Sequence, residues 1–458
     1  MVYPVIVVGG GPVGLVAAHA LSRAGVDFLL LEGRPDIVFH AGSDLVLTNS
    51  GMRVLNQLAL LEPLDKVSTD LDVMQRVDHQ GRNIGDIDFL AYQKEFFGLA
   101  PRVLSRHDIS AVFYDSLPGS IKSRLLPNKR VASLASNANG DGVVVTCRDG
   151  SVYEASLVIG ADGAHSIVRQ QMRELAVQHN ATLPADSMPA PVNDEQPFLT
   201  TFRCLWLRFP SVSAIPVGTT SETHGPIATT QLFAAEDTTV LALYERLDTP
   251  TRDRIHYTQA DQDSVAARWG NLLAAKGSDM TIAQAWAART ESGLVNLEEG
   301  VVENWSFDGR VVLTGDAAHK FTPSTGAGCN NGIVDIVALV NELYPILPSS
   351  ASPDRPMPGK HEVASALQRY QSKRHGAVTA GCAYSGQVTK SSSWADWQSW
   401  LVDRYVLQFK FVQRRLALMG ATRDTAKTPV FSFIEGVDRK GGSVPWIKQM
   451  KAPTVVKV

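Results

Sequence analysis

Short apolar runs near the start of the chain alternate with a segment of helical spacing. Residues 5–8 form a β-branched run, residues 15–24 carry apolar positions at helical intervals, and residues 28–31 form a second apolar run. A glycine-rich turn separates the first run from the helical segment. A strand, a turn, a helix and a strand within about 30 residues predict the opening of a doubly wound α/β sheet.

Alternation between apolar and polar residues returns later in the chain. Two runs within residues 142–160 flank Asp149-Gly150, which predicts a β-hairpin that rejoins the sheet. Residues 176–198, rich in Ala, Pro, Asn and Asp, predict a loop. A mainly β lobe is expected next, with a helix near 261–275 and strands at 199–209, 228–233 and 240–244.

The last third of the chain returns to the first pattern before it becomes helical. Residues 311–313 are predicted as a buried strand and residues 328–343 as a helix. Residues 349–360, rich in Pro and Ser, are predicted as a loop, and the chain beyond Glu362 is mostly helical in pattern.

These elements predict an α/β fold with three parts. A Rossmann-like domain is expected to be discontinuous, comprising residues 1–190 and 300–380. A mainly β domain on the substrate side is expected at residues 191–299, and a helical extension at residues 381–458. Part of residues 70–100 is expected to contribute to the substrate side.

Composition narrows the class of partner. The 458 residues carry 43 basic and 46 acidic side chains, and no basic stripe interleaves with aromatic residues, so a nucleic-acid partner is not expected. The four cysteines are widely spaced and match no metal-binding pattern, which indicates no metal site and a reducing compartment. No apolar run reaches the roughly 18 residues of a membrane span, and we expect a cytoplasmic protein.

The turn after the first strand has the spacing of a dinucleotide-binding fingerprint. Gly9, Gly11 and Gly14 fit a tight turn, a close approach of backbone to a pyrophosphate, and packing of helix on strand. Glu32 ends the second strand, where a carboxylate accepts hydrogen bonds from a ribose. A plain turn would explain the glycines alone, but not the strand, helix and acid around them. An acidic strand end favours FAD or NAD over NADP in this pocket.

Two later segments decide between these cofactors. Residues 160–169 (GADGAHSIVR) follow a predicted strand, and residues 309–319 (GRVVLTGDAAH) contain their own strand and turn. Together with the glycine turn they resemble the three fingerprints of the single-component (group A) flavoprotein monooxygenases, a family that includes para-hydroxybenzoate and phenol hydroxylases. This resemblance implies an FAD-binding domain of the glutathione reductase-like type.

The sequences of residues 45–49 (LVLTN) and 55–58 (LNQL) are most similar to those of fungal epoxidases and hydroxylases. Those enzymes oxidise meroterpenoids, indole diterpenes and polyketides. The resemblance therefore implies a small-molecule substrate from secondary metabolism, oxidised at an electron-rich alkene, aromatic or indole carbon.

The resemblance also implies roles for individual residues. Asp316 would accept a hydrogen bond from the ribityl chain of FAD, and Arg106 would lie against the FAD phosphates and ribityl chain. Asp162 would serve both FAD and NADPH, with Arg169 on the NADPH side, although Arg169 also fits a salt-bridge residue. His319 fits a core histidine as well as a site residue. Further cofactor contacts are expected from Arg34, Gly42, Pro323, Gly326, Ala327, Gly328 and Asn330.

The family mechanism implied by this resemblance uses NADPH, or NADH, to reduce FAD. Oxygen is the co-substrate and adds to the reduced flavin as a C4a-hydroperoxide, which hydroxylates or epoxidises the substrate. The protein then has to exclude water and position the substrate.

Two residues are candidates for contact with the substrate. Asp44 lies in a stretch that leads toward the flavin in this fold, although a solvated loop acid fits as well. Arg203 is predicted to share a strand face with Leu205 and Leu207, and a charge on an apolar face suggests a pocket group. Trp206, on the other face, is predicted to be core.

The predicted C-terminal helices place Trp394, Trp397 and Trp400 three residues apart, ahead of several basic residues. Packing onto the FAD domain is the simpler interpretation, and peripheral contact with a membrane surface is the alternative.

Two other functions fit the same scaffold. One is a flavin-dependent reductase or dehydrogenase, and the other is a flavin-free binding protein similar to GDP-dissociation inhibitors. The second predicts a degraded flavin site, whereas Glu32, Arg106, Asp162 and Asp316 are all present.

Overall fold

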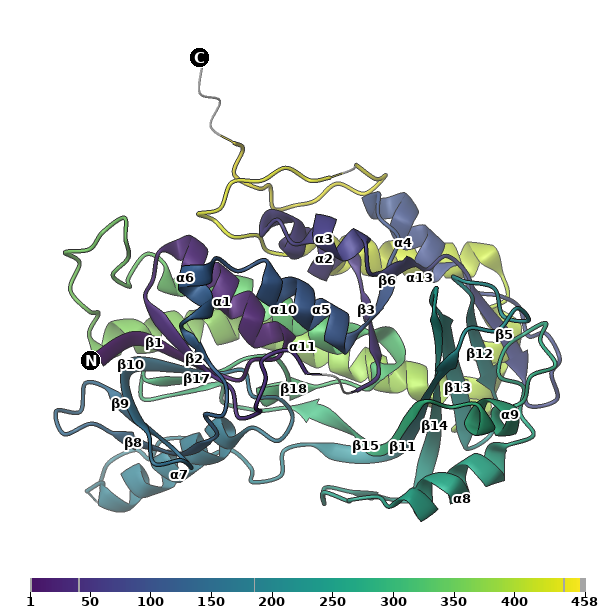
Figure 1. Ribbon diagram of the computed structural model, residues 1–458, viewed down its shortest axis with the longest axis horizontal. Helices are drawn as coiled ribbons and strands as arrows, with labels where there is room; N and C mark the ends of the chain where they lie inside the picture. Colours follow the sequence, from purple (N-terminus) through teal and green to yellow (C-terminus); the bar gives the residue numbers. More distant parts are fainter. Residues whose placement is uncertain (1, 40–41, 185, 440, 454–458) are drawn as a thin grey trace.

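The computed structural model describes residues 2–39, 42–184, 186–439 and 441–453. Within these residues the strands form an eight-stranded, a seven-stranded and a three-stranded sheet, here called the large, second and third sheets. Helices surround the large sheet, and a long helix runs from it toward the second sheet (Figure 1). The α/β fold expected from the sequence is confirmed.

The large sheet is built on the predicted opening unit. Its central strand β1 (Val2–Val8) pairs in parallel with β2 (Phe28–Leu31) on one side and β10 (Val152–Gly160) on the other. Six of its strands follow one another in the order β16 (Ser306–Phe307), β17 (Val311–Leu313), β10, β1, β2 and β7 (Leu125–Leu126), and β9 and β8 extend the sheet from β10. The predicted hairpin is also present, because β9 (Val143–Cys147) pairs antiparallel with β10, and β8 (Val131–Ser136) pairs with β9.

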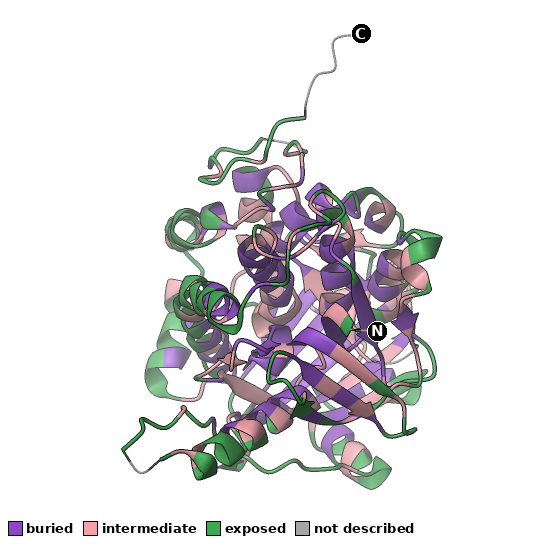
Figure 2. Cartoon of the chain, turned by 90° about the vertical axis from the view of Figure 1, so that its left-hand side faces the viewer, coloured by how far each residue is buried: buried purple, intermediate pink, exposed green. Residues whose placement is uncertain are grey.

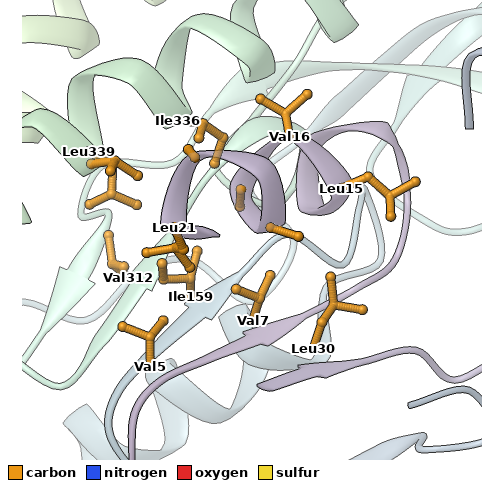
Figure 3. Close-up of a cluster of buried hydrophobic side chains, with 14 of the residues drawn as sticks. Val5, Val7, Leu15, Val16, Leu21, Leu30, Ile159, Val312, Ile336 and Leu339 are labelled. Atoms are coloured by element: carbon orange, nitrogen blue, oxygen red, sulfur yellow. The ribbon is translucent and has the colours of Figure 1, made fainter. Parts of the chain in front are cut away.

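Helices cover both faces of this sheet, as parallel strands require. One face carries α1 (Pro12–Ala24), α5 (Arg106–Asp115) and α10 (Ala327–Leu343), and the other carries α7 (Ile167–Thr182). Apolar side chains of α1, α10 and the strands meet in one core, including Val7, Leu21 and Ile336 (Figure 3). Buried residues concentrate between the layers, while the outer helix faces are exposed (Figure 2).

The second sheet is mainly antiparallel. Its order is β18 (His319–Lys320), β15 (Glu291–Val301), β11 (Leu199–Pro210), β14 (Thr238–Thr251), β13 (Ala228–Ala234), β12 (Thr220–His224) and β5 (Met74–Asp78). Two helices, α8 (Gln259–Trp269) and α9 (Ile282–Ala287), pack on one face through a separate apolar cluster. The edge strand β5 comes from the stretch of residues 70–100.

The third sheet is small, and its strands come from the first 105 residues of the chain. It consists of β3 (Asp44–Leu47), β6 (Arg102–Ser105) and β4 (Thr69–Asp70). Helices α2 (Asn49–Gln57), α3 (Leu61–Asp65) and α4 (Phe89–Phe97) come from the same stretch of the chain, and the short α6 (Gly119–Lys122) precedes β7 of the large sheet.

The C-terminal region is helical only in its first part. Helix α11 (Lys360–Ser392) runs without a break through the boundary expected at residue 380. It is followed by α12 (Trp397–Leu401), a π-helical turn η3 (Val402–Val406), α13 (Lys410–Arg423) and a 3₁₀ turn η4 (Thr425–Lys427). Beyond η4 the described residues form no helix, which corrects the expected helical extension to 458. No described helix combines the length and the apolar character that crossing a membrane requires.

Other boundaries differ from the sequence-based expectations. Helix α7 continues to Thr182, inside the loop expected at 176–198, because it packs against β8. Helix α8 ends at Trp269, short of the expected 275. Strands β5, β12 and β15 were not predicted, because their residues lack a clear alternation of apolar and polar types.

A buried carboxylate joins three elements beside the large sheet. Asp335 on α10 accepts hydrogen bonds from the backbone N–H of Gly315 (3.1 Å), from His319 Nε2 (2.5 Å) and from Arg374 Nε on α11 (2.7 Å). Burial alone would raise the pKa of Asp335, but the neighbouring His319 and Arg374 lower it to about 2. His319 is therefore a core residue with a partner, and the turn that carries Asp316 is attached to α10 and α11.

Replacing Asp335 by alanine should destabilise the fold strongly. Arg374 and His319 would stay buried without their carboxylate, and removing one member of a buried pair costs about 3–5 kcal/mol. Urea unfolding of the purified variant measures this loss.

Glu342→Ala is the matched control on the same helix. Its partners Arg369 and Lys373 are more than half exposed, so the loss should stay near 1 kcal/mol or below. Equal losses in the two variants would contradict a special role for Asp335.

Candidate active site

The glycine turn has the geometry that close approach of an anion requires. A Cβ at Gly14 would lie 1.9 Å from the carbonyl oxygen of Gly9, so the helix can pack here only on glycine. A Cβ at Gly11 would meet nothing within 4 Å, which leaves open space in front of the backbone. Helix α1 begins directly after this residue, at Pro12. Its free N–H groups and dipole suit a pyrophosphate.

Glu32 is held in place at the end of β2. Its Oε2 accepts a hydrogen bond from the backbone N–H of Gly10 (2.6 Å), and its Oε1 accepts one from the N–H of Arg34 (2.8 Å). The carboxylate is buried but has lone pairs left over. These can accept hydrogen bonds from ribose hydroxyls, as the sequence suggested.

Asp162 and Arg169 stabilise the second motif, residues 160–169, through hydrogen bonds within it. Asp162 accepts hydrogen bonds from Ser166 Oγ (2.5 Å) and from the N–H of Val168 (3.1 Å), and burial raises its pKa. Arg169 is buried and donates to the carbonyl oxygens of Ala164 (2.7 Å) and Ala317 (3.0 Å). The guanidinium of Arg169 thus connects the second motif to the third, residues 309–319, through Ala317. Contact of either side chain with NADPH stays a prediction.

Asp316 faces the main cavity from the turn after β17. It accepts a hydrogen bond from Lys320 Nζ (2.8 Å). Burial alone would raise the pKa of Asp316, but Lys320 and Arg106 lower it, so the carboxylate is ionised. A Cβ at Gly42 would come within 3.1 Å of Arg106 Cδ, so glycine leaves room for that side chain. A charged acceptor beside an open cavity suits a ribityl hydroxyl.

The start of α10 also faces this cavity. Gly326 has a positive φ of 62°, and a Cβ there would lie 3.0 Å from Val46 Cβ. Asn330 is buried; it accepts from the N–H of Thr48 (2.9 Å) and donates to the carbonyl oxygens of Val46 and Gly326 (2.7 Å each). The asparagine therefore locks the start of α10 to β3. Pro323, Ala327 and Gly328 line the cavity directly.

The cavity is large enough for two ligands. Its volume is about 2240 Å³, more than twice the roughly 1,000 Å³ at the upper end for pockets that hold one drug-sized molecule. One side is formed by Arg106, Asp316 and the start of α10, and another by strands of the second sheet. The C-terminal helices complete the wall. In the described part of the chain, no group of His, Cys, Asp and Glu side chains could hold a metal ion.

Asp44 lines this cavity, where its Oδ1 accepts a hydrogen bond from Arg208 Nη2 (2.6 Å). Burial raises the pKa of Asp44 to about 6, although Arg208 opposes the shift. It is therefore a buried acid with one partner and not a solvated loop residue.

Arg203 does not line the cavity, which corrects its expected place in the pocket. Its side chain shares a face with Leu205 and Leu207, and that face packs under α8 and α9. There Arg203 Nε donates to Glu245 Oε2 (2.7 Å) on β14. Trp206, expected in the core, lies on the cavity side. The alternation of residues along β11 correctly placed Arg203 and Trp206 on opposite faces of the strand. The pattern did not show which of the two faces lines the cavity.

The three C-terminal tryptophans separate in the structure. Trp394 lies in the turn after α11, where its Nε1 donates to Asp403 Oδ2 (2.9 Å). Trp397 and Trp400 lie on α12 and are exposed, so they do not pack onto the large sheet.

The strand β12 supplies cavity residues that were not predicted from the sequence. Glu222 and His224 line the cavity beside Gln231 on β13, and Asp403 on η3 completes the group. The segment TSETH contains no apolar residue, yet all five positions are buried. The sequence signals that could have identified this strand are its two threonines and the Glu-x-His alternation. Both fit a buried polar strand, whose side chains hydrogen-bond to one another.

Comparison with known proteins agrees with this geometry. The family model described as FAD binding domain matches residues 2–375. The chain belongs to this family. It is 30% identical to the FAD-dependent monooxygenase srdH of Neurospora crassa, over 98% of this chain and 100% of the relative.

Two solved structures share the fold. HpxO of Klebsiella pneumoniae, complexed with FAD and uric acid, superposes with a TM-score of 0.68 at 20% identity, covering 91% of this chain and 97% of that one. The p-nitrophenol 4-monooxygenase PnpA of Pseudomonas putida gives 0.69 at 19% identity, with the same coverage.

The protein is an FAD-dependent monooxygenase with the fold of the group A enzymes. The family match and the curated relatives do not support the alternatives of a reductase and of a flavin-free binding protein. The glycine turn, Glu32 and the Asp316 side of the cavity fit FAD at its two ends.

Asp316→Ala should weaken FAD binding about tenfold to a hundredfold, because a hydrogen bond to a charged group contributes about 1.5–3 kcal/mol. Flavin absorbance per protein after dialysis measures the retention. Asp308→Asn is the control: Asp308 forms an ion pair with Lys360 away from the cavity, and asparagine tolerates its positive φ of 58°. Unchanged FAD retention in Asp316→Ala would contradict the assignment.

Asp44 should give the stability of the FAD-free protein a distinct pH dependence. Between about pH 4 and about pH 6 the folded chain keeps a proton that the unfolded chain has lost. Stability of the unsubstituted protein should therefore fall as the pH rises through this window, by up to about 3 kcal/mol. Asp44→Asn should lack this slope in urea unfolding at a series of pH values. Parallel pH profiles would show that the carboxyl titrates normally.

Proposed function

We propose that this monooxygenase uses NADPH and oxygen to hydroxylate or epoxidise an electron-rich carbon of a secondary metabolite. The observation that carries the proposal is one cavity with two unlike ends. Arg106, Asp316 and Lys320 make one end charged, whereas Trp206, Phe233 and Leu297 make the other largely apolar. The first end suits a polar cofactor chain and the second an organic ring system.

Bound FAD would supply the redox chemistry, accepting a hydride from NADPH and then activating oxygen as the C4a-hydroperoxide. The chain's own task is to hold FAD by Glu32, Arg106 and Asp316, and to keep water from the substrate end. In this proposal Asp162 and Arg169 position the surface that NADPH approaches, and NADH is the alternative reductant.

The substrate class is supported by the cavity and by the relatives. The FAD-dependent monooxygenases that the chain resembles include srdH and other fungal enzymes, and a cavity of this volume leaves room for a polycyclic substrate beside FAD. We propose a fungal-type secondary metabolite with an alkene, aromatic or indole carbon as the site of oxidation.

A cytoplasmic enzyme that touches a membrane surface is part of the same proposal. Trp397, Phe411 and Met419 are exposed along α12 and α13, next to basic residues such as Lys410 and Arg415. Apolar side chains beside cations favour contact with an anionic lipid surface.

The test supplies the FAD-loaded enzyme with NADPH, labelled oxygen gas and a panel of polycyclic alkenes, phenols and indoles. We expect one labelled oxygen atom in the product, and NADPH consumption that matches product and not hydrogen peroxide. Parallel reactions with NADH identify the reductant. Flavin reduction without labelled product from any panel member would contradict the proposed oxygen transfer.

A further inference from the structure

A buried chain of charged groups lies at the substrate end of the cavity. His224 Nδ1 contacts Asp403 Oδ2 (2.8 Å), and His224 Nε2 contacts Glu222 Oε2 (2.8 Å). Asp403 also accepts from Arg76 Nη1 (2.6 Å) and from Trp394 Nε1. Strands of the second sheet and the C-terminal segment thus meet in a single polar cluster.

The protonation of this cluster follows from its contacts. Burial alone would lower the pKa of His224, but the carboxylates of Asp403 and Glu222 on its two sides raise it to about 9. Burial alone would also raise the pKa of Asp403, which His224 and Arg76 lower. The positive charges of Arg76 and His224 therefore balance the negative charges of Asp403 and Glu222, and the cluster has no net charge.

Glu222 is the most exposed of the three cluster members that line the cavity. Its side chain is 11% exposed, against 3% for His224 and 2% for Asp403, and it lines the cavity wall. Its Oε1 accepts from Gln231 Nε2 (2.7 Å), and Tyr244 donates to Gln231 Oε1 (3.0 Å), which fixes the amide. Each carboxylate oxygen has one protein donor and can accept another bond.

The register of the second sheet places this carboxylate at one end of a row. Glu222 on β12 lies opposite Gln231, Gln231 opposite Ala242, and Ala242 opposite Trp206. A Cβ at Gly293, the next position in the row, would lie 2.7 Å from Trp206 Nε1, so glycine leaves space for the indole. Three strand spacings separate the acid from the indole, about 14 Å along the cavity wall. Strands β12, β13, β14 and β11 stand side by side in Figure 1.

The same row reaches the cofactor end. Gln231 Nε2 also lies 3.2 Å from the carbonyl oxygen of Ser324, which follows Pro323 in the turn before α10. A group bound to Glu222 is therefore one side chain away from the turn expected to line the flavin.

We propose that Glu222 accepts a hydrogen bond from a neutral hydroxyl, phenolic or enolic, at one end of a flat apolar substrate, while His224 and Asp403 position the carboxylate. The inference rests on the proposed function for its substrate class and adds the polar group that class must carry. A hydroxyl fits better than an ammonium group, because the cluster is already neutral and a further cation would be buried without a partner. A hydrogen bond to a carboxylate also moves electron density toward the ring or double bond that is oxidised.

The test is binding to the oxidised, FAD-loaded enzyme without turnover. β-Naphthol and naphthalene differ only in the hydroxyl, and perturbation of the flavin absorbance gives the affinity for each. We expect a preference for β-naphthol of about tenfold or more, since a hydrogen bond to a charged group contributes about 1.5–3 kcal/mol. Glu222→Gln should reduce this preference to below about threefold.

His224→Gln tests the positioning role, because a purely structural effect would weaken both probes equally, whereas loss of positioning lowers the preference alone. Glu245→Gln is the matched control: this acid lies on β14 of the same sheet, is paired with Arg203 and Arg268, and does not line the cavity. It should keep the preference.

Three results would overturn the inference. They are equal affinity for the two probes in the unsubstituted enzyme, an unchanged preference in Glu222→Gln, and tighter binding of naphthylmethylammonium than of β-naphthol. FAD content and NADPH-driven flavin reduction are measured on every variant. A failure of the proposed oxygen chemistry shows in the labelled-oxygen assay described above, which is separate from this binding test and leaves the binding result interpretable.

Discussion

The buried carboxylate of Asp335 is the interaction on which the cofactor side depends. It binds the turn after β17 through Gly315, the strand after that turn through His319, and the long helix α11 through Arg374. Asp316 can face the cavity as a charged acceptor because this turn is held from behind. The buried charges are tolerated because each has a partner of opposite sign.

The site is assembled from elements far apart in the sequence. Arg169 fastens the second motif to the third through the carbonyl oxygen of Ala317, and Asn330 fastens the start of α10 to β3. Their hydrogen bonds to protein groups hold these side chains in place, and their contact with cofactors stays a prediction. Preorganisation of this kind lets a few residues, Glu32 and Asp316 above all, present their lone pairs to a ligand without rearrangement.

The two faces of the second sheet have different roles. One face packs under α8 and α9 and uses Arg203 with Glu245 as an internal ion pair. The other carries a gradient from the indole of Trp206 to the carboxylate of Glu222. In the proposed function, this arrangement would orient an apolar substrate with its polar end at Glu222. Trp394, in the turn after α11, and Asp403, on η3, hydrogen-bond to each other, and Asp403 also contacts His224, so this part of the cavity wall requires the C-terminal segment.

The sequence by itself determined the cofactor side of this monooxygenase. Glycine spacing, an acid at a strand end and the motif around Asp316 are local requirements of backbone geometry and charge, and they can be read along the chain. Only the tertiary structure decided the substrate side. Which face of β11 met the cavity, and that the polar strand TSETH would be buried beside Asp403, depended on pairing between segments up to about 180 residues apart. A local pattern shows that two faces exist, but the partner that covers each face is set by long-range packing.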